Sequence, residues 1–589
     1  MTVNGCRTFA GVIGLFLTAA LTVPAPAQSS RDSQCTANRA IPWDQQIVGC
    51  TDAIKSEKYS GRDLAVLFNT RGNIYLAEDD FERAVADYDQ AIRLDPQYAI
   101  AFNGRGTAAQ AKGELDRAIA DYSEAIRLDP TYILAFNNRG LAYSSAHDYD
   151  RAIADFDQAI QLDSKNPIAF NNRGNTYLAK GELDRAVADY DQVIELDPNN
   201  AVAFNNRANA YLAKRNPDRA IADYDQAIRL DPKLATAFNR RGYAYSLKGD
   251  LDRAVADYDE VIKLDPKNAL AFNNRGNIYL AKNDFDRAVA DYDAAIRLDP
   301  TYAIAFNGRG TADQAKGEID RAIADYSEAI RLDPTYILAV NNRGLAYSSK
   351  EDYDRAITDF DQVITLDPKN AAAFNKRANA YLAKGDLDHA IADYTEGIRL
   401  DSKNAIAFNG RGNTYLAKGD PDRAIADYDE AIRLDPDESG TYLNRGLANL
   451  YSGSLPKAEA DFERSSELNP KDAYTALWLD VADRRSSLPS RLAQATTQID
   501  MTKWPAPLIQ FYLGQITPDA ALAAADDPDT NTKKHQACEA NFFIGEWALQ
   551  RSAKDEAVHR FRLAAADCGK NNNWLTLIND ELNTLGAQP

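Results

Sequence analysis

The sequence predicts an all-α solenoid, a right-handed superhelix of helix-turn-helix repeats followed by a helical C-terminal module. Three observations support this fold class. Asp-Pro or a close variant recurs every 34 residues, twelve such repeats cover residues 65–472 without insertion or deletion, and small and aromatic residues recur at fixed positions within each repeat. A single helical pair of this kind cannot bury its own apolar face, but a stack of twelve can.

We number the positions of each repeat 1–34, so that repeat 4 spans residues 167–200. Position 4 is Phe in ten repeats, position 8 is Gly or Ala, position 20 is Ala in all twelve, and position 24 is always Tyr or Phe. In repeat 4 these residues are Phe170, Gly174, Ala186 and Tyr190. We expect the Asp at position 31, here Asp197, to cap the first helix of the next repeat.

This period and pattern resemble the tetratricopeptide repeat (TPR) family over residues 65–472. The resemblance implies that each repeat forms two antiparallel helices, A and B. It also implies that small residues at positions 8 and 20 let the two helices approach closely, and that aromatic residues fill the space between neighbouring repeats. In the family, one face of helix A lines a concave groove.

The N-terminus predicts export. Residues 1–27 have the pattern of a signal peptide, with Arg7 before a fifteen-residue apolar run, Phe9–Val23, and a small-x-small cleavage motif at 25–27. The alternative is an uncleaved anchor. Cleavage would leave a periplasmic or secreted chain that begins at Gln28 and has no further apolar run of membrane length. Residues 28–64 are then expected to form an N-terminal cap that contains a lone helix B at 43–54.

The cysteines agree with export. Removal of the signal would leave Cys35, Cys50, Cys538 and Cys568, which form two locally spaced pairs at opposite ends of the chain. In an oxidising compartment we expect the disulfides Cys35–Cys50 and Cys538–Cys568. Residues 538–568 fit one divergent TPR, in which the two Cys fall at the same end of an antiparallel hairpin.

The C-terminal module, residues 473–589, departs from the strict period. LWLDVADRR (477–485), WPAPLIQFYLGQIT (504–517) and the divergent TPR resemble the tail of the periplasmic lipoprotein NlpI and its relatives. That resemblance implies a periplasm-facing adaptor that brings proteases and cell-wall hydrolases together. This chain differs from those relatives because it has no lipidation Cys and many more repeats.

Composition and motifs argue against several classes of function. The net charge of −20 and the pI of about 4.8 disfavour nucleic-acid binding. The sequence has no HExxH motif, no Cys/His set with zinc spacing, no GxSxG motif and no phosphate-binding Gly loop. We therefore predict neither an enzyme nor a metal or cofactor site, and no small-molecule substrate is evident.

Two charged positions recur in all twelve repeats, Arg at position 7 and Asp at position 23, for example Arg173 and Asp189. They could form a charged ladder that binds a ligand. We favour a structural role instead, because an Arg stem can pack like an apolar residue while its head pairs with a carboxylate on a helix B beside it.

Asparagines mark a candidate peptide-binding groove. Positions 5 and 9 lie one helical turn apart and therefore share a face of helix A. An amide carries both donor and acceptor groups, so a row of amides can pair with the backbone of an extended peptide. The candidates at position 5 are Asn69, Asn103, Asn137, Asn171, Asn205, Asn239, Asn273, Asn307, Asn341, Asn375 and Asn409. Those at position 9 are Asn73, Asn175, Asn209, Asn277, Asn379 and Asn413.

Tyr98, Tyr132, Tyr302 and Tyr336 at position 34 are candidates for additional aromatic contacts. The alternative for the asparagines is that helix A merely tolerates them and that duplication copied them. Residues 99–166 match residues 303–370 at 59 of 68 positions, so the array contains a duplicated block with an offset of six repeats.

The predicted function is that of an exported protein–protein interaction scaffold or adaptor, which binds partner polypeptides in the groove and has a role in cell-envelope maintenance. The alternative is a periplasmic chaperone or carrier for extended polypeptides. The two differ in that an adaptor has a few stoichiometric partners, whereas a carrier binds many peptides weakly.

Overall fold

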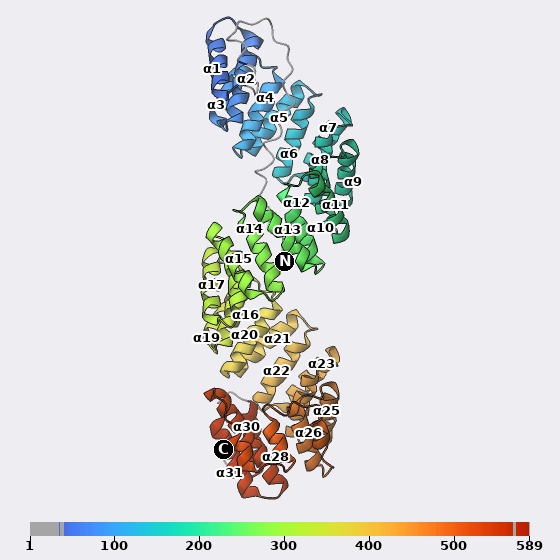
Figure 1. Cartoon of the computed structure of the whole chain (residues 1–589), viewed down its shortest axis with the longest axis vertical. Helices are drawn as coiled ribbons and strands as arrows, with labels where there is room; N and C mark the ends of the chain where they lie inside the picture. The colour runs from blue at the N-terminus through green and yellow to red at the C-terminus, as the bar shows by residue number, and fades with distance from the viewer. Residues whose placement is uncertain (1–34, 36–40, 569–572, 588–589) are drawn as a thin grey trace. The chain divides into compact units, whose positions relative to one another are not determined.

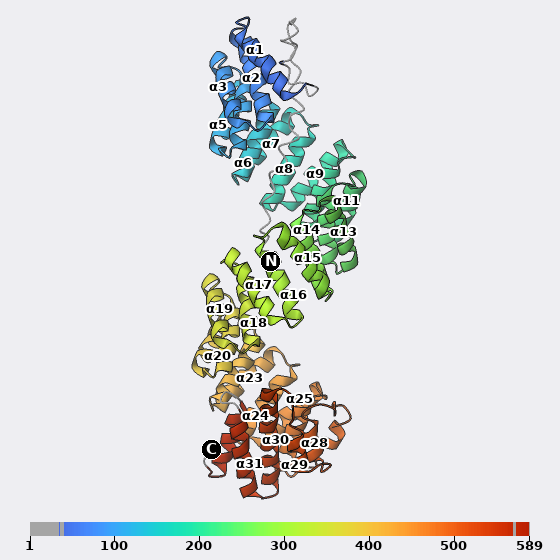
Figure 2. The ribbon, with the colours of Figure 1, turned by 60° about the vertical axis from the view of Figure 1, so that its left-hand side comes forward.

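The computed structural model describes residue 35, residues 41–568 and residues 573–587. The segment predicted to be a signal peptide lies outside these residues. Within them, every regular element is a helix, which confirms the all-α repeat fold. Figures 1 and 2 show the helices following one another in antiparallel pairs along each part of the chain.

The first helices of the twelve repeats, which we call helix A, start at or just before position 1. They are α2 (Gly61–Ala77), α4 (Ala99–Ala111), α6 (Ile133–Ser145), α8 (Pro167–Lys180), α10 (Ala201–Ala213), α12 (Ala235–Leu247), α14 (Ala269–Ala281), α16 (Ala303–Ala315), α18 (Ile337–Ser349), α20 (Ala371–Lys384), α22 (Ala405–Ala417) and α24 (Ser439–Tyr451).

The second helices of the repeats, helix B, all end at the Leu of position 30. They are α3 (Phe81–Leu94), α5 (Leu115–Leu128), α7 (Tyr149–Leu162), α9 (Leu183–Leu196), α11 (Pro217–Leu230), α13 (Leu251–Leu264), α15 (Phe285–Leu298), α17 (Ile319–Leu332), α19 (Tyr353–Leu366), α21 (Leu387–Leu400), α23 (Pro421–Leu434) and α25 (Leu455–Leu468).

The remaining helices flank the repeats. They are α1 (Trp43–Lys55) before the array, and α26 (Ala473–Arg485), α27 (Leu492–Ala495), α28 (Ala506–Tyr512), α29 (Pro518–Ala523), α30 (Thr530–Gln550), α31 (Lys554–Asp567) and α32 (Asn573–Thr584) after it.

The chain divides into two compact units, Met1–Ile278 and Tyr279–Pro589, and each has its own internal packing. Within each unit, helix A of a repeat packs on its own helix B, and that helix B packs on the next helix A. Each repeat therefore contacts mainly its neighbours, as expected of a solenoid.

The core is a series of small clusters that bridge adjacent repeats. In one of them Tyr177, Ala186 and Tyr190 of repeat 4 meet Ala210 of repeat 5. Gly174 lies close to the Tyr190 ring: a Cβ at position 174 would be only 2.8 Å from Tyr190 Cε1. The small residue at position 8 therefore allows helix A to lie against a fully buried aromatic side chain.

The predicted helix cap is wrong. Asp197 does not cap the following helix but ends helix α9, and its carboxylate accepts a hydrogen bond from the backbone N–H of Asn199 at 3.1 Å. The cap of helix α10 is Asn200 at position 34, whose side chain accepts from the N–H of Ala203. Two turn residues, Pro198 and Asn199, separate the two roles, because an Asx turn must finish before helix A begins.

The C-terminal module has a continuous core that is richer in aromatic residues than the repeats. Trp478 lies at its centre and contacts Phe462, Phe542, Phe543 and Trp574 with ring centroids 5.4–6.3 Å apart. Helices α30 and α31 pair as a hairpin in which Gly545 lies against Phe561, with the geometry that Gly174 has against Tyr190. The last helix, α32, lies against α31, α30 and also α22, the helix A of repeat 11.

Candidate binding surface

The exposed side of helix A is almost free of charge, although the chain as a whole is strongly acidic. At positions 1–13 of the twelve repeats the sole carboxylate is Asp313, which is buried. The acidic residues are instead carried by helix B and by the turns. We call the residues at positions 2, 5, 6 and 9 of each repeat the helix-A face.

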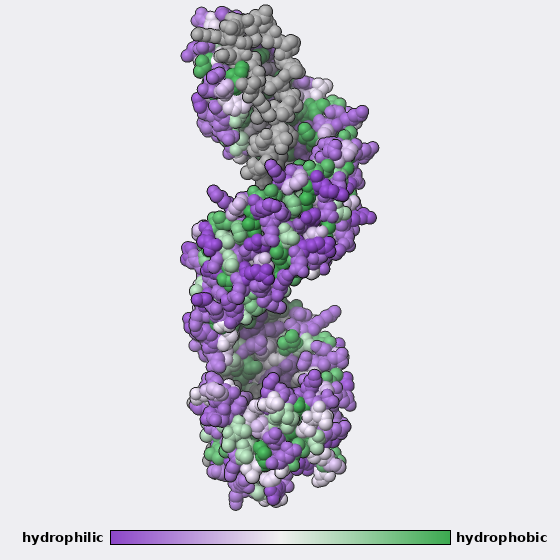
Figure 3. Space-filling model, in the orientation of Figure 1, coloured by the Kyte–Doolittle hydropathy of each residue, from purple (hydrophilic) through white to green (hydrophobic). Residues whose placement is uncertain are grey.

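Aliphatic side chains at position 2 are the most exposed part of the helix-A face. Isolated exposed aliphatic residues are ordinary, but here they recur at one position of a regular array. Figure 3 shows hydrophobic residues distributed among hydrophilic ones on the side of the molecule that it presents. The exposed aliphatic residues at position 2 are Ile100, Ile168, Val202 and Leu270 in the first compact unit and Ile304, Leu338 and Ile406 in the second.

The asparagines at position 5 are mostly buried. Seven are buried, namely Asn69, Asn103, Asn137, Asn205, Asn273, Asn307 and Asn375, and the other four, Asn171, Asn239, Asn341 and Asn409, are partly exposed. Several are bonded to the following repeat: Asn206 Nδ2 donates to Asn171 Oδ1 at 2.9 Å, and Asn138 Nδ2 donates to Asn103 Oδ1 at 3.0 Å. In these pairs the amide links one helix A to the next.

Five amides at position 5 are not linked in this way. The Oδ1 atoms of Asn69, Asn137, Asn205, Asn273 and Asn375 are buried and accept no hydrogen bond among the described residues. A buried carbonyl without a donor costs about 1–3 kcal/mol. Because these five oxygens are buried, they are not part of the surface that a partner could contact.

The asparagines at position 9 are more exposed, and their role depends on the residue at position 24. Asn175 Oδ1 accepts a hydrogen bond from the buried Tyr190 hydroxyl at 2.8 Å, and Asn209 accepts one from Tyr224 at 2.7 Å. The same bond joins Asn73 to Tyr88, Asn379 to Tyr394 and Asn413 to Tyr428. Asn277 is exposed.

Where position 9 is not Asn, five of the six repeats avoid an unpaired hydroxyl at position 24 in another way. In repeats 2 and 8, Tyr122 and Tyr326 donate to Gln110 and Gln314 at 2.8 Å, close to the Thr at position 9. In repeats 3, 9 and 12 position 9 is Leu and position 24 is Phe, which has no hydroxyl to satisfy. The Asn at position 9 therefore has a structural task, and what it still offers a partner is its amide N–H groups.

This pairing of positions 9 and 24 is visible in the sequence, but the face that the asparagines share does not reveal it, because the two positions lie on different helices. Peptide contact by the asparagines at positions 5 and 9 stays a prediction. The exposed groups that the structure offers are the amide N–H groups at position 9 and the aliphatic residues at position 2, and the latter were not predicted from the sequence.

The arginines at position 7 connect helices rather than face a ligand. Arg173 makes a two-pronged contact with Asp189 of its own repeat, at 2.9 and 2.6 Å, and its third nitrogen reaches Asp157 of the preceding repeat at 2.5 Å. Arg207 and Arg241 make the same contacts in repeats 5 and 6. Burial raises the pKa of Asp189, and the Arg173 guanidinium opposes that shift.

The tyrosines at position 34 lie at the start of helix A. Tyr98 is buried, and Tyr132, Tyr302 and Tyr336 are partly buried. Burial raises the pKa of Tyr302 to about 12. These rings contribute mainly to the packing between repeats.

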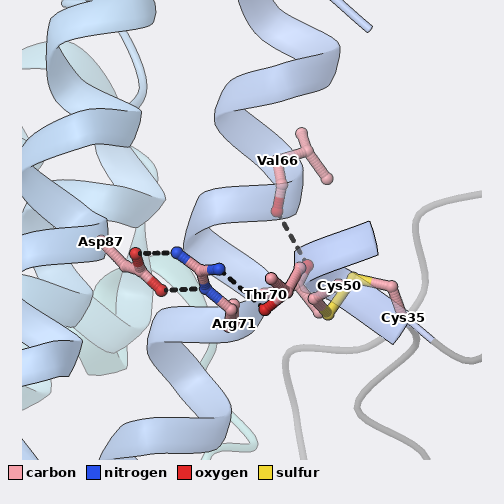
Figure 4. Close-up of a disulfide and its surroundings, with 7 residues drawn as sticks. Cys35, Cys50, Val66, Thr70, Arg71 and Asp87 are labelled. Atoms are coloured by element: carbon pink, nitrogen blue, oxygen red, sulfur yellow. Dashed lines mark hydrogen bonds and ion pairs between the residues drawn. A yellow bond between two sulfur atoms is a disulfide. The ribbon is translucent and has the colours of Figure 1, made fainter. Parts of the chain in front are cut away.

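Disulfides lie near both ends of the described chain. Cys35 is bonded to Cys50 of α1 with a Cα–Cα distance of 4.6 Å, and Cys538 of α30 is bonded to Cys568 after α31 with a distance of 5.2 Å. Figure 4 shows the first disulfide beside Arg71, which binds Asp87. Arg71 also donates to Thr51 Oγ1 at 2.9 Å, which ties α1 to the first repeat.

The described residues contain no cluster of His, Cys, Asp and Glu that could hold a metal ion. Among the helices described, none is both long and apolar enough to cross a bilayer.

Several solved structures align with this chain. A chain of the Cut9–Hcn1 hetero-tetramer of the APC/C is 14% identical to this chain. The match covers 73% of this chain and 98% of that one, with a TM-score of 0.37. Yeast Tom70 is 18% identical, with coverages of 74% and 98% and a TM-score of 0.32. YrrB, described as a TPR protein with an unusual peptide-binding site, is 23% identical, with coverages of 33% and 97% and a TM-score of 0.29.

The family comparison matches most of the array. Models described as TPR repeat or tetratricopeptide repeat match residues 69–133, 133–166, 156–188, 174–214, 201–234, 242–282, 269–302, 312–350, 346–385, 378–419 and 405–438. These segments together cover more than half of the chain. The pairing of helices A and B, the small residues at positions 8 and 20 and these matches lead to one conclusion: the chain belongs to the tetratricopeptide repeat family.

Proposed function

We propose that this chain is an exported scaffold or adaptor that binds extended segments of partner proteins along the helix-A face. TPR proteins act as protein–protein interaction scaffolds, so the general class of function follows from the family. The observation that supports this particular surface is the combination of exposed aliphatic side chains at position 2 with amide groups at position 9, on a face that carries almost no charge.

The chemistry of this face suits a polypeptide. The free energy falls when a partner's apolar groups cover exposed Ile, Leu and Val side chains, because apolar surface is removed from water. Amide N–H groups can pair with the carbonyls of an extended backbone with little demand on its sequence. Because the tyrosine hydroxyls hold the amide oxygens in place, the amides at position 9 are already oriented before a partner binds, which lowers the entropic cost of binding.

Export and an envelope role extend this proposal. Export rests on the signal-like N-terminus and on the two disulfides. The envelope role rests on the resemblance of the C-terminal module to NlpI and its relatives. Cell fractionation with N-terminal sequencing tests export, and a mature chain that begins at Gln28 in the periplasm or medium is the expected result.

The binding surface is tested by co-purification of the full-length chain. The test variant combines Ile168→Asp and Val202→Asp on the helix-A face, and the matched control combines Ala188→Asp and Ala222→Asp on the exposed side of helix B in the same repeats. A few stoichiometric partners that are lost only with the test variant would support the adaptor. Many weakly bound polypeptides lost in the same way would favour the chaperone or carrier. Partners recovered equally with both variants would contradict the proposed surface.

A further inference from the structure

The duplicated block of the array preserves the helix-A face. Repeats 2 and 3 (99–166) and repeats 8 and 9 (303–370) differ at nine positions. None of the nine lies at position 2, 5, 6 or 9. The differences fall in the core, in the turns and on helix B, for example Phe136 against Val340 and Ala154 against Thr358.

The two copies also have the same local geometry. Asn138 donates to Asn103, and Asn342 donates to Asn307, both at 3.0 Å. The Tyr122 and Tyr326 hydroxyls donate to Gln110 and Gln314, both at 2.8 Å.

The aliphatic residues at position 2 correspond as well. Ile100 is 38% exposed and its counterpart Ile304 is 48% exposed. Leu134 is partly exposed and its counterpart Leu338 is 51% exposed. The two copies therefore present the same chemical groups in the same local arrangement.

Each compact unit contains one copy. Repeats 2 and 3 belong to the unit Met1–Ile278, and repeats 8 and 9 belong to the unit Tyr279–Pro589. Because a solenoid repeat contacts mainly its neighbours, each copy is surrounded by its own set of helices and neither needs the other to be complete.

We infer that the chain carries two equivalent binding surfaces, one in each compact unit, and binds two copies of the same partner segment. This inference rests on the proposed function, but in these four repeats position 9 is Thr or Leu, so the exposed aliphatic side chains at position 2 carry the contact without an amide at position 9. The segment that fits is an extended, uncharged stretch of polypeptide with aliphatic side chains.

The lack of free charge on the two copies and their exposed aliphatic side chains both indicate a segment of this kind. At positions 1–13, repeats 2 and 3 contain no acidic residue, repeats 8 and 9 contain only the buried Asp313, and the Arg at position 7 is paired within the protein. Neither copy therefore offers a free charge to attract a charged segment, and a charge placed against the exposed Ile and Leu would lose its hydration without compensation.

Stoichiometry tests the inference. The probe is a fluorescein-labelled peptide of six Leu-Ser-Gly triplets with blocked ends, titrated into the full-length chain by calorimetry and by fluorescence anisotropy. One variant, Ile100→Asp with Leu134→Asp, alters the first copy, and another, Ile304→Asp with Leu338→Asp, alters the second. The controls, Ala120→Asp with Ala154→Asp and Ala324→Asp with Thr358→Asp, place the same two charges on the exposed side of helix B in the same repeats. Circular dichroism checks that every variant keeps its helix content.

We expect two peptides per chain with one common affinity, one peptide per chain for either variant, and at least a tenfold loss of affinity when both copies are altered. One peptide per chain for the unaltered protein would overturn the two-site inference but leave the proposed function standing. A peptide bound equally by all variants would overturn the inference because it binds elsewhere. If the unaltered chain binds no peptide, the proposed surface fails and the inference fails with it.

Discussion

Asn175 and Tyr190 form the side-chain pair that best explains the polar pattern of the repeats. Tyr190 is fully buried, and its hydroxyl donates to Asn175, which is partly exposed on helix A. In repeat 3 the same two positions are Leu141 and Phe156, an apolar pair without a hydroxyl. The two solutions are interchangeable in principle, because a buried donor is costly only when its acceptor is missing.

This interchange can be tested with a double-mutant cycle. Asn175→Leu alone leaves the Tyr190 hydroxyl buried without an acceptor, and we expect it to lower the free energy of unfolding by about 1–3 kcal/mol. Tyr190→Phe alone should cost about 0.5–1.5 kcal/mol. The double variant recreates the pair of repeat 3, so its cost should be smaller than the sum of the two single costs. Urea unfolding followed by circular dichroism measures all three, and strictly additive costs would contradict the coupling.

Glu546 is a second residue with a definite prediction, because it is fully buried in the C-terminal module. Arg485 Nη2 lies 2.6 Å from Glu546 and 2.6 Å from Glu581, so one cation serves two carboxylates. Burial raises the pKa of Glu546 to about 7, and Arg485 opposes the shift. A carboxyl with a raised pKa in the folded state stabilises the fold fully below its unfolded pKa, and that contribution is lost as the pH rises through about 7.

We therefore expect the C-terminal module to become less stable between pH 5 and pH 8. Glu546→Gln, which cannot ionise, should remove this part of the loss, so the variant should be more stable than the unaltered chain at pH 8 but not at pH 5. Tryptophan fluorescence reports on this module, because Trp478, Trp504, Trp547 and Trp574 lie in it. Equal pH profiles for the two proteins would show that Glu546 stays ionised throughout.

At the scale of the element, each helix A is tied to two helices B by one arginine. Arg173 on α8 binds Asp189 on α9 and Asp157 on α7. Asp189 is buried, so its charge depends on that partner. The arginine therefore fixes how consecutive helices are aligned, which apolar contacts alone specify less sharply.

Loss of this tie should be far more costly than loss of a surface ion pair. Arg173→Met leaves Asp189 buried without a cation and should lower the free energy of unfolding by about 3–5 kcal/mol. Arg185→Met removes an exposed arginine that pairs with Glu182 in the same repeat, and should cost about 0–1 kcal/mol. Urea unfolding compares the two variants, and hydrogen exchange should show the added opening of the first in α7, α8 and α9. Equal costs would mean that Asp189 does not need the arginine.

Much of this level of structure could be predicted from the sequence. The helical pairs, the packing of Gly174 against Tyr190 and the structural role preferred for Arg173 follow from residues that recur at a fixed period. The cap at Asp197 was predicted wrongly, because a turn of three residues separates it from the next helix. The contact of α32 with α22 could not be predicted, since Thr576 donates to the carbonyl of Ala417, 159 residues away, and no local pattern signals such a contact.

At the scale of the whole molecule, disulfides secure both ends of the described chain. If the protein is exported and oxidised, thiol labelling of the mature chain, unfolded without reductant, should find no free cysteine. After reduction it should find four, namely Cys35, Cys50, Cys538 and Cys568. Two labelled thiols before reduction would show that one of the two bonds is not formed in the cell.

The contact between α32 and α22 distinguishes the C-terminal end of the second compact unit from the rest of the array. Because α32 lies against α22, the chain itself already covers part of helix A in repeat 11. The contact lies at the C-terminal end of α22, at the Ala417 carbonyl, whereas Ile406 near the start of the same helix is 77% exposed. The C-terminal module therefore braces repeat 11, which it does not follow directly in the chain, and leaves the helix-A face of that repeat accessible.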